Sequence, residues 1–318
     1  MSTAAPDVSK RKAWLMAARP QTLPAGSAPV IIGVGLAIHD DVFAIAPAVA
    51  ALIGALLLQI GTNFANDYFD AVKGTDAPDR EGFTRVTAGG LIPPQRVKAA
   101  MAATYTLALV GGLYLVAIGG VPILIVGLSS ILAGLLYTGG PYPYGYYGLG
   151  DLFVFVYFGV IAVSGTYYVQ AIAQSSAGLF PMWLPPGSIP VDVVIASLVA
   201  AGLSTAILVV NNIRDIEDDR AAGKRSLAVI LGYRWSRLEY VVMTAMAYVV
   251  PPVLYVLADY DGWVLLPLLT IPLAVRVTET VLTERGGQPL NEALERTGQL
   301  MALHAVLFAV GLTASTVV

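Results

Sequence analysis

Long apolar stretches alternate with short polar segments along almost the whole chain. Each stretch approaches the roughly 20 residues that a helix needs to cross the hydrocarbon core of a bilayer. This pattern predicts an all-α, polytopic membrane protein: a single domain over residues 1–318, with nine transmembrane helices in one bundle around a cavity. We expect these helices at residues 21–38, 43–66, 99–118, 121–137, 152–173, 192–212, 238–258, 263–283 and 298–317.

The positions of lysine and arginine predict how these helices are oriented. With nine spans, the N-terminus and the loops after even-numbered spans share one side, and that side receives all 18 basic residues. The opposite loops carry acids such as Asp40 and Asp259. Basic residues concentrate on the cytoplasmic side of membrane proteins. We therefore expect an integral cell-membrane protein whose N-terminal segment (1–19), cap loops (67–98 and 213–237) and cavity mouth face the cytoplasm.

Composition supports this class and excludes several others. Hydrophobic residues make up 57% of the chain and charged residues only 12%, against about 25% charged in soluble domains. The chain has no cysteine and two histidines that lie far apart, which excludes disulfides, thiolate chemistry and a histidine-rich metal site. The net charge of −3 argues against a nucleic-acid partner.

Most of the polar residues that could carry chemistry fall into two cytoplasmic regions. In the first, Gln59, Asn63, Asn66 and Asp70 are spaced by four, three and four residues, so they share one face of a helix. Such a stripe faces the interior of a bundle or a water-filled cavity rather than lipid. The second region follows the sixth span and contains Asn211, Asn212, Asp215 and Asp219.

Two interpretations of these acids compete. Helix caps paired with nearby basic residues need one Asp or Asn each, and would not continue two turns back into a span. Carboxylate oxygens without Cys or His nearby favour a hard metal ion, namely magnesium, manganese or calcium. Magnesium usually completes its coordination shell with water and substrate phosphates. The two clusters therefore predict a clamp for a diphosphate, whose remaining oxygens would contact Lys73, Arg85, Lys224 and Arg225.

A third cytoplasmic loop, after the fourth span, is rich in tyrosine and has no Lys or Arg. We interpret Tyr146 and Tyr147 as part of an interfacial aromatic belt. Tyr137 lies at the end of the span, where its ring or hydroxyl would serve a cationic intermediate or a phosphate. On the fifth span, Thr166 and Gln170 share a face, which suits either helix–helix hydrogen bonding or contact with substrate.

These motifs resemble those of a known family. Asn66-Asp67-Tyr68-Phe69-Asp70 and Asp215-Ile216-Glu217-Asp218-Asp219 are similar to the paired aspartate-rich motifs of the UbiA-type intramembrane prenyltransferases. The likeness covers nearly the whole chain. Five segments resemble the 1,4-dihydroxy-2-naphthoate branch of that family, which acts in menaquinone biosynthesis: residues 19–24, 66–76, 137–140, 165–168 and 211–215.

The resemblance implies a reaction and the residues behind it. An allylic polyprenyl diphosphate would lose its diphosphate, and the electron-rich ring of 1,4-dihydroxy-2-naphthoate would attack the resulting cation and lose carbon dioxide, giving demethylmenaquinone. Two magnesium ions would be held by Asn66, Asp67, Asp70, Asp215 and Asp219. The diphosphate would be bound by Lys73, Arg85, Lys224, Arg225, Asn211 and Asn212, with Lys224 and the four aspartates as the catalytic set. The acceptor side of the cavity would contain Arg19, Asn63, Tyr137, Thr166 and Gln170.

Two features differ from the wider family. Its first motif often has a third Asp four residues after the second, whereas the next acid here is Asp76, six residues after Asp70. Some members also have a Lys in the loop after the fourth span, and this chain has none there. Both departures are similar to the naphthoate branch.

Other functions stay open at this point. Within the enzyme class, the acceptor could be 4-hydroxybenzoate, homogentisate, a chlorophyllide or a glycerol-phosphate lipid. Intramembrane Asn and Asp also fit an ion-coupled secondary transporter, although such sites usually lie near the membrane midplane rather than at one face. A structural scaffold is disfavoured, because polar side chains within a span make membrane insertion less favourable and a scaffold would have no use for the polar stripe. Magnesium-dependent release of diphosphate would separate the enzyme from the transporter.

Overall fold

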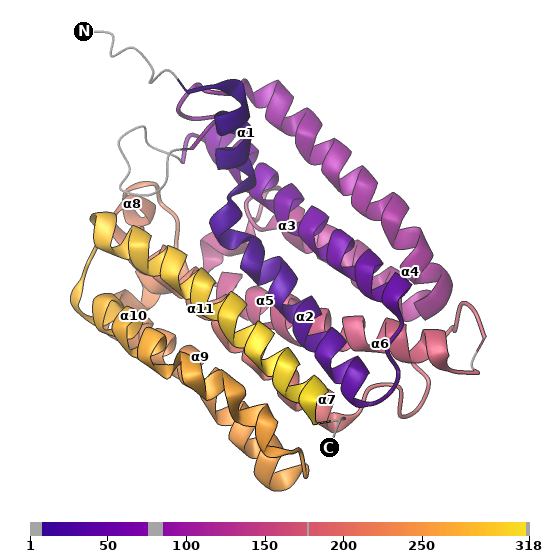
Figure 1. The fold of residues 1–318 in the computed structure, drawn as a ribbon. Coiled ribbons are helices and arrows are strands. Elements are labelled where there is room, and N and C mark those ends of the chain that lie inside the picture. Colours follow the sequence, from indigo (N-terminus) through magenta and orange to yellow (C-terminus); the bar gives the residue numbers. More distant parts are fainter. Residues whose placement is uncertain (1–7, 76–84, 177, 316–318) are drawn as a thin grey trace, which may run out of the picture.

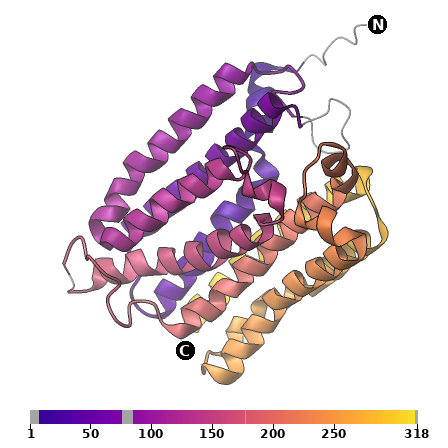
Figure 2. The ribbon, with the colours of Figure 1, turned by 180° about the vertical axis from the view of Figure 1, so that it is seen from behind.

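The computed structural model describes residues 8–75, 85–176 and 178–315, and every regular element within these ranges is helical. Figures 1 and 2 show the helices as one bundle from opposite sides. The elements are α1 (Lys10–Ala18), η1 (Pro20–Thr22), α2 (Leu23–His39), α3 (Ile45–Lys73), α4 (Pro94–Leu136), η2 (Tyr144–Tyr147), α5 (Gly150–Val154), the π-helix η3 (Phe155–Ile161), α6 (Ala162–Gln174), α7 (Val191–Arg214), α8 (Ile216–Ala221), α9 (Leu227–Leu257), η4 (Gly262–Thr270), α10 (Ile271–Thr283) and α11 (Gly287–Ala314).

The helical membrane fold is confirmed, and the count of spans depends on α4. Within the described residues, eight continuous helical segments are long and apolar enough to cross a membrane, and α4 is the longest, with 43 residues. A straight helix of that length would extend for about 65 Å, twice the thickness of the hydrocarbon core. Gly120 interrupts it with φ 66° and ψ −149°. Figure 2 shows this magenta segment folded back on itself, so α4, with its kink at Gly120, supplies the two legs that were predicted as spans 99–118 and 121–137.

The reversal at Gly120 is held by the loop between α6 and α7. The amide of Val121 donates to the carbonyl of Pro181 (3.0 Å), and the amide of Phe180 donates to the carbonyl of Ala117 (2.9 Å). A Cβ at Gly120 would overlap the Pro181 carbonyl. Because positive φ and this close approach both favour glycine, a larger residue at position 120 would disturb the turn.

Several helices extend beyond their apolar stretches at the end of the bundle that we predicted to face the cytoplasm. The predicted span 43–66 is only part of α3, which continues to Lys73 and ends where Gly74 adopts φ 70°. Similarly, α9 begins at Leu227 and α11 at Gly287. Polar side chains on these turns face the cavity or the aqueous side, so they end the apolar stretch without ending the helix. Consequently the first aspartate-rich motif lies on α3 rather than in a loop; Asp76, the next acid, lies outside the described residues.

The core consists of two main clusters of buried apolar residues. One joins α2, α6, α7, α9, η4, α10 and α11, and the other joins α1, α3, the first leg of α4 and residues 86–92. In Figure 1, α2 lies beside α11 at the centre of the bundle and α3 lies beside α4. Helices therefore line both sides of a space between the two clusters.

Glycines allow the closest helix contacts in this bundle, as is common in membrane proteins. A Cβ at Gly202 of α7 would overlap the carbonyl of Met243 in α9. We expect Gly202→Ala to destabilise the protein by about 1–3 kcal/mol, because the helices must move apart. Thermal unfolding in detergent measures the change. Gly111→Ala is the matched control, since its Cβ would meet no atom of the described residues within 4 Å; equal loss in both variants would contradict this account.

Candidate active site

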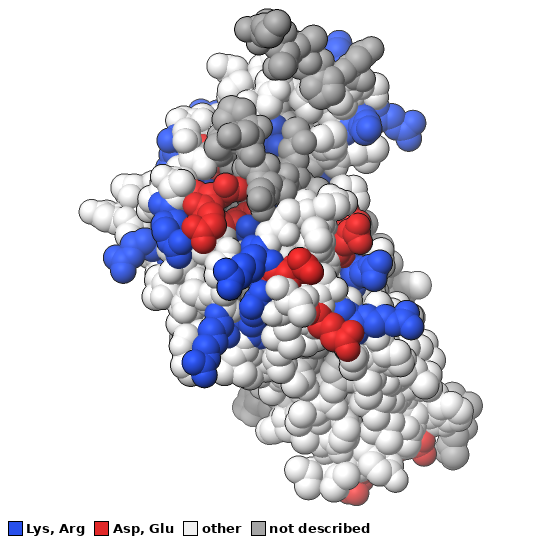
Figure 3. Space-filling model, turned by 90° about the vertical axis from the view of Figure 1, so that its left-hand side faces the viewer, with Lys and Arg blue, Asp and Glu red and all other residues white. Residues whose placement is uncertain are grey.

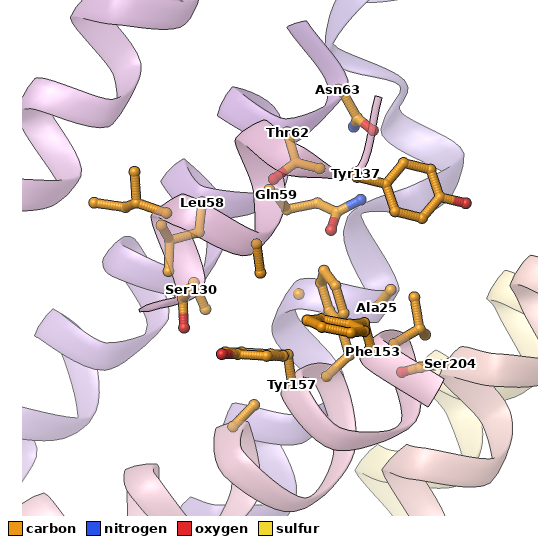
Figure 4. Close-up of a pocket in the computed structure, with 18 of the residues that line it drawn as sticks. Ala25, Leu58, Gln59, Thr62, Asn63, Ser130, Tyr137, Phe153, Tyr157 and Ser204 are labelled. Carbon is orange, nitrogen blue, oxygen red and sulfur yellow. The ribbon is translucent and has the colours of Figure 1, made fainter. Parts of the chain in front are cut away.

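A cavity of about 400 Å³ lies between α2, α3, α4, η3, α6 and α7, with charged residues from α3, α8 and the connecting segments at its polar end. Figure 4 shows Gln59 and Thr62 of α3 on one side and the rings of Phe153 and Tyr157 on the other. Of the residues predicted for the site, the wall contains Arg19, Asn63, Asn66, Asp70, Arg85, Tyr137, Thr166, Asn211, Asn212, Asp215, Asp219 and Lys224. Asp67, Lys73, Gln170 and Arg225 lie outside the wall.

Asp70, on α3, contacts one basic residue from each of the two predicted cap loops. Its carboxylate is buried, with only 2% of the residue exposed. Lys224 Nζ lies 3.4 Å from Oδ1, and Arg85 Nη2 lies 3.8 Å from Oδ2. The Tyr146 hydroxyl donates to Oδ1 at 2.5 Å. The interpretation of Tyr146 as part of an interfacial belt is therefore wrong, because its ring turns inward to an acid on another helix, whereas Tyr147 is exposed.

Lys224 reaches this position through the turn that follows α8. Gly223 has φ 74°, a conformation that favours glycine, and it redirects the chain toward the cavity. The Lys224 amide donates to the carbonyl of Asp219 (2.8 Å), which fixes the turn. The buried Lys224 ammonium lies 4.8 Å from the centre of the Tyr146 ring. An arrangement of this kind stabilises the cation in place and presents it to the cavity.

The second acidic cluster is organised by Arg214, which sequence analysis placed only among the cytoplasmic basic residues. Arg214 Nε donates to Asp215 Oδ1 (2.7 Å) and Nη2 donates to Oδ2 (2.8 Å). The same guanidinium donates to Asn211 Oδ1 (2.8 Å) and Asn291 Oδ1 (3.0 Å). The side chains of Arg214 and Asp215 are both buried, so removing either one would leave the charge of the other uncompensated. Asp219 lies one helical turn beyond Asp215 and also lines the cavity.

Asp67 has a different position from Asp70. Its Oδ2 accepts hydrogen bonds from both the amide (3.2 Å) and the hydroxyl of Thr87, and only 2% of the residue is exposed. Thr87 lies two residues after Arg85, so Asp67 holds the segment that brings Arg85 to the cavity. Nothing in the sequence spacing pointed to Thr87 as a partner.

The end of α3 is tied to the loop after α4. Asn66 Oδ1 accepts from the Thr138 hydroxyl (3.1 Å), and Lys73 Nζ donates to the carbonyls of Thr138 (2.6 Å) and Gly140 (3.1 Å). Lys73 therefore contacts loop carbonyls rather than the cavity. Arg225 is exposed, and its amide donates to the carbonyl of Tyr146 (3.0 Å).

The two polar residues of the fifth predicted span, Thr166 and Gln170, have different surroundings. Thr166 lines the cavity, and its hydroxyl donates to the Ala162 carbonyl of its own helix (2.7 Å). Gln170 is fully buried outside the wall and donates to the Thr166 carbonyl (2.9 Å). Neither role predicted for Gln170 is seen: this hydrogen bond stays within its own helix, and the residue lies outside the cavity wall.

Aromatic rings form much of the remaining wall. Tyr144 stacks on Phe153 with ring centres 4.1 Å apart, and Tyr137 meets Tyr144 edge to face at 5.4 Å. Burial raises the pKa of the Tyr144 hydroxyl, which donates to the Ala133 carbonyl (2.9 Å) and so stays protonated. The π-helix η3 adjoins these rings, and such helices often occur at functional sites. An aromatic, water-poor wall suits a cationic intermediate.

The donor set at the polar end fits a hard divalent cation. Within the part of the chain that the structure describes, no three Asp, Glu, His or Cys side chains form a ready-made metal cluster. The residues that line the cavity nevertheless include three aspartates and an asparagine, namely Asp70, Asp215, Asp219 and Asn66. Carboxylate and amide oxygens without thiolate or imidazole are the ligands of magnesium-like ions.

The comparisons with known proteins agree with this geometry. Residues 27–291 match the UbiA prenyltransferase family, and the chain belongs to that family, as its aspartate-rich motifs predicted. It is 38% identical over 312 residues to the 1,4-dihydroxy-2-naphthoate octaprenyltransferase of Escherichia coli (strain K12), with 96% of each chain covered. It is 39% identical over 299 residues to the protein of the same name from Mycobacterium tuberculosis (strain ATCC 25618 / H37Rv), with 93% of this chain and 95% of that one covered.

A solved structure shows the same fold. The UbiA homolog from Archaeoglobus fulgidus bound to DMAPP and Mg²⁺ aligns with a TM-score of 0.60 and 15% sequence identity. The alignment covers 95% of this chain and 99% of the homolog. At this identity the likeness supports the fold of the bundle.

Proposed function

We propose that the protein transfers a polyprenyl group from an allylic polyprenyl diphosphate to 1,4-dihydroxy-2-naphthoate. The products are diphosphate, carbon dioxide and the prenylated naphthoquinol, which is the reduced form of demethylmenaquinone. The observation that carries this proposal is the pairing of Asp70 with Lys224 and Arg85, one from each predicted cap loop, at the polar end of an apolar, aromatic cavity. The near full-length likeness to two dihydroxynaphthoate octaprenyltransferases supports the choice of acceptor.

The polar end binds the leaving group. Asp70, Asp215 and Asp219, with Asn66, would hold magnesium, which we place at two ions per site. When bound, magnesium supplies positive charge that offsets the charge of the diphosphate. Lys224 and Arg85 already lie beside Asp70, so their cationic groups can contact the diphosphate oxygens as the C–O bond breaks. Asn211 and Asn212 add amide groups from the facing wall of α7.

The remaining predicted residues divide into positioning and cavity roles. Asp67 orients the segment that carries Arg85, and Lys73 holds the loop that carries Tyr146. Arg225, exposed at the mouth, contributes to the positive field that attracts the anionic donor. The acceptor side contains Arg19, Asn63, Tyr137 and Thr166.

The chemistry then proceeds away from water. The C–O bond to the diphosphate breaks, and its electron pair leaves with the diphosphate. The naphthoate ring forms the new C–C bond to the allylic cation at the carbon that bears the carboxylate. Loss of carbon dioxide returns its bonding pair to the ring and restores aromaticity. The apolar and aromatic walls exclude water that would otherwise capture the cation.

A panel of acceptors tests this assignment. Purified protein in liposomes is given a polyprenyl diphosphate, Mg²⁺ and, in turn, 1,4-dihydroxy-2-naphthoate, 4-hydroxybenzoate, homogentisate and a glycerol-phosphate lipid. We expect rapid prenylation of the dihydroxynaphthoate only. Faster prenylation of another acceptor would contradict the proposed substrate, and a transporter would release no diphosphate from any mixture.

We also propose that the N-terminus and the polar end of the cavity face the cytoplasm of the cell membrane. In Figure 3 the blue basic side chains lie over the upper and middle parts of the molecule, with red acids among them, whereas the described lower end shows isolated acids and no blue. This segregation is the pattern of a cytoplasmic end.

Cysteine labelling checks the orientation directly, because the natural chain has no cysteine. Gly262 and Gln288 are exposed near opposite ends of the segment η4–α10. In intact cells, we expect an impermeant thiol reagent to label Gly262→Cys and to spare Gln288→Cys. After the cells are opened, both should react. The reverse result in intact cells would place the active site on the outer face.

A further inference from the structure

Gln59 carries an unpaired oxygen in the cavity wall. Only 6% of the residue is exposed, and the residue lines the cavity. Its Oε1 has no hydrogen-bond partner among the described residues. Figure 4 shows the Gln59 amide directed into the space between Thr62 and the ring of Phe153. Buried polar atoms in native proteins are nearly always paired, so an unpaired acceptor beside a cavity points to a ligand that donates a hydrogen bond.

The orientation of this amide is fixed by Thr22. The Thr22 hydroxyl donates its single hydrogen to the Arg19 carbonyl (3.0 Å). Its oxygen can then only accept, and it does so from Gln59 Nε2 (3.0 Å) and Asn63 Nδ2 (3.0 Å). Asn63 is fixed further by its bond to the Ala18 carbonyl (2.9 Å). Because Nε2 must face Thr22, Oε1 must face away from it. The position of Oε1 as a hydrogen-bond acceptor is therefore fixed before any ligand binds.

The chemistry of the substrates decides which of them can meet Gln59. An isoprenoid tail has no donor and would leave Oε1 unpaired. A diphosphate carries only acceptor oxygens and would be repelled by the carbonyl dipole. Among the reactants, a hydroxyl of the aromatic acceptor is the group that supplies a hydrogen. We propose that Gln59 Oε1 accepts a hydrogen bond from a ring hydroxyl of the acceptor, and that Thr22 is the positioning residue for this contact.

This proposal rests on the proposed function and adds a recognition element to it. In 1,4-dihydroxy-2-naphthoate the 1-hydroxyl is next to the carboxylate and bonds to it, so the 4-hydroxyl is the one free to donate. The contact would therefore select for an acceptor that carries a hydroxyl at position 4.

A deletion of the hydroxyl from the ligand tests the contact. The dissociation constants of 1,4-dihydroxy-2-naphthoate and 1-hydroxy-2-naphthoate are measured by ligand fluorescence, with the full-length protein in nanodiscs. The wild type should bind the dihydroxy compound about 10-fold more tightly, as expected for one buried hydrogen bond. Gln59→Met keeps the side-chain shape and removes the acceptor, so the ratio should fall to near one. An unchanged ratio in Gln59→Met would overturn the proposal.

Variants of Thr22 and Ser204 complete the test. Thr22→Val frees the Gln59 amide and should also reduce the ratio, whereas Thr22→Ser keeps the hydroxyl and should restore it. Ser204→Ala removes a wall hydroxyl from α7 and should leave the ratio unchanged. If the wild type binds the two naphthoates equally, the contact is absent although the proposed function stands. If it binds neither, the proposed function itself fails, and the inference fails with it.

Discussion

Replacing Asp70 with asparagine should lower the rate of diphosphate release by roughly 10³-fold at saturating Mg²⁺, because the substitution removes the charge that pairs with Lys224 and Arg85 at the cavity and would hold the metal. The buried carboxylate of Asp70 contacts Lys224, Arg85 and Tyr146. Asparagine preserves its shape but not its charge, so the cations lose their orientation toward the cavity. Diphosphate release from a polyprenyl diphosphate, followed with a coupled assay, measures the effect.

The control for this substitution uses an acid at the opposite end of the bundle. Asp41 is exposed in the turn after α2, and Asp41→Asn should keep the full rate. Thermal unfolding in detergent confirms that Asp70→Asn is folded. A folded Asp70→Asn protein with nearly wild-type turnover would show that Asp70 is structural.

Lys224→Ala should lower the rate by about 10²–10³-fold, the usual effect of removing one preorganised contact to a developing anion. The effect should appear in kcat for the prenyl donor, because negative charge on the leaving oxygen grows toward the transition state. The KM for the aromatic acceptor should change little. Steady-state kinetics with each substrate varied in turn separates these quantities.

Arg234→Ala is the control for this experiment, because it also removes one positive charge. Arg234 is exposed ten residues after Lys224 and lies over the Trp235 ring, 5.6 Å from its centre. Its removal should change the rate only slightly, since surface charges act weakly and are screened. Equal losses in the two variants would mean that the loop acts as a general electrostatic surface.

Much of the bundle and half of the site follow from periodicity in the sequence. The polar stripe on α3 has helical spacing, so its period alone predicts that Asn63, Asn66 and Asp70 share one wall with Gln59, and all four line the cavity. The two legs of α4 could also be predicted as separate spans, because each apolar stretch is long enough to cross a bilayer. In both cases the signal is local in the chain.

The contacts that complete the site join distant segments, and spacing carries no information about them. Tyr146 reaches Asp70 across 76 positions, and Thr87 reaches Asp67 across 20. A loop of tyrosines without basic residues looks the same whether it faces lipid or an acid on another helix. The pairing of Arg214 with Asp215 could not be predicted for another reason. An arginine just after a span is already explained by the excess of basic residues on the cytoplasmic side, so nothing suggested a role in the site.

The most direct test of the central claim counts the products of one reaction. Purified protein in liposomes receives a polyprenyl diphosphate, Mg²⁺ and dihydroxynaphthoate labelled in its carboxyl group. Released carbon dioxide, diphosphate and prenylated naphthoquinol are measured together over the first turnovers. We predict that the three appear in equal amounts and that Asp70→Asn suppresses all of them. Diphosphate formed without carbon dioxide, or no diphosphate at all, would contradict the proposed reaction.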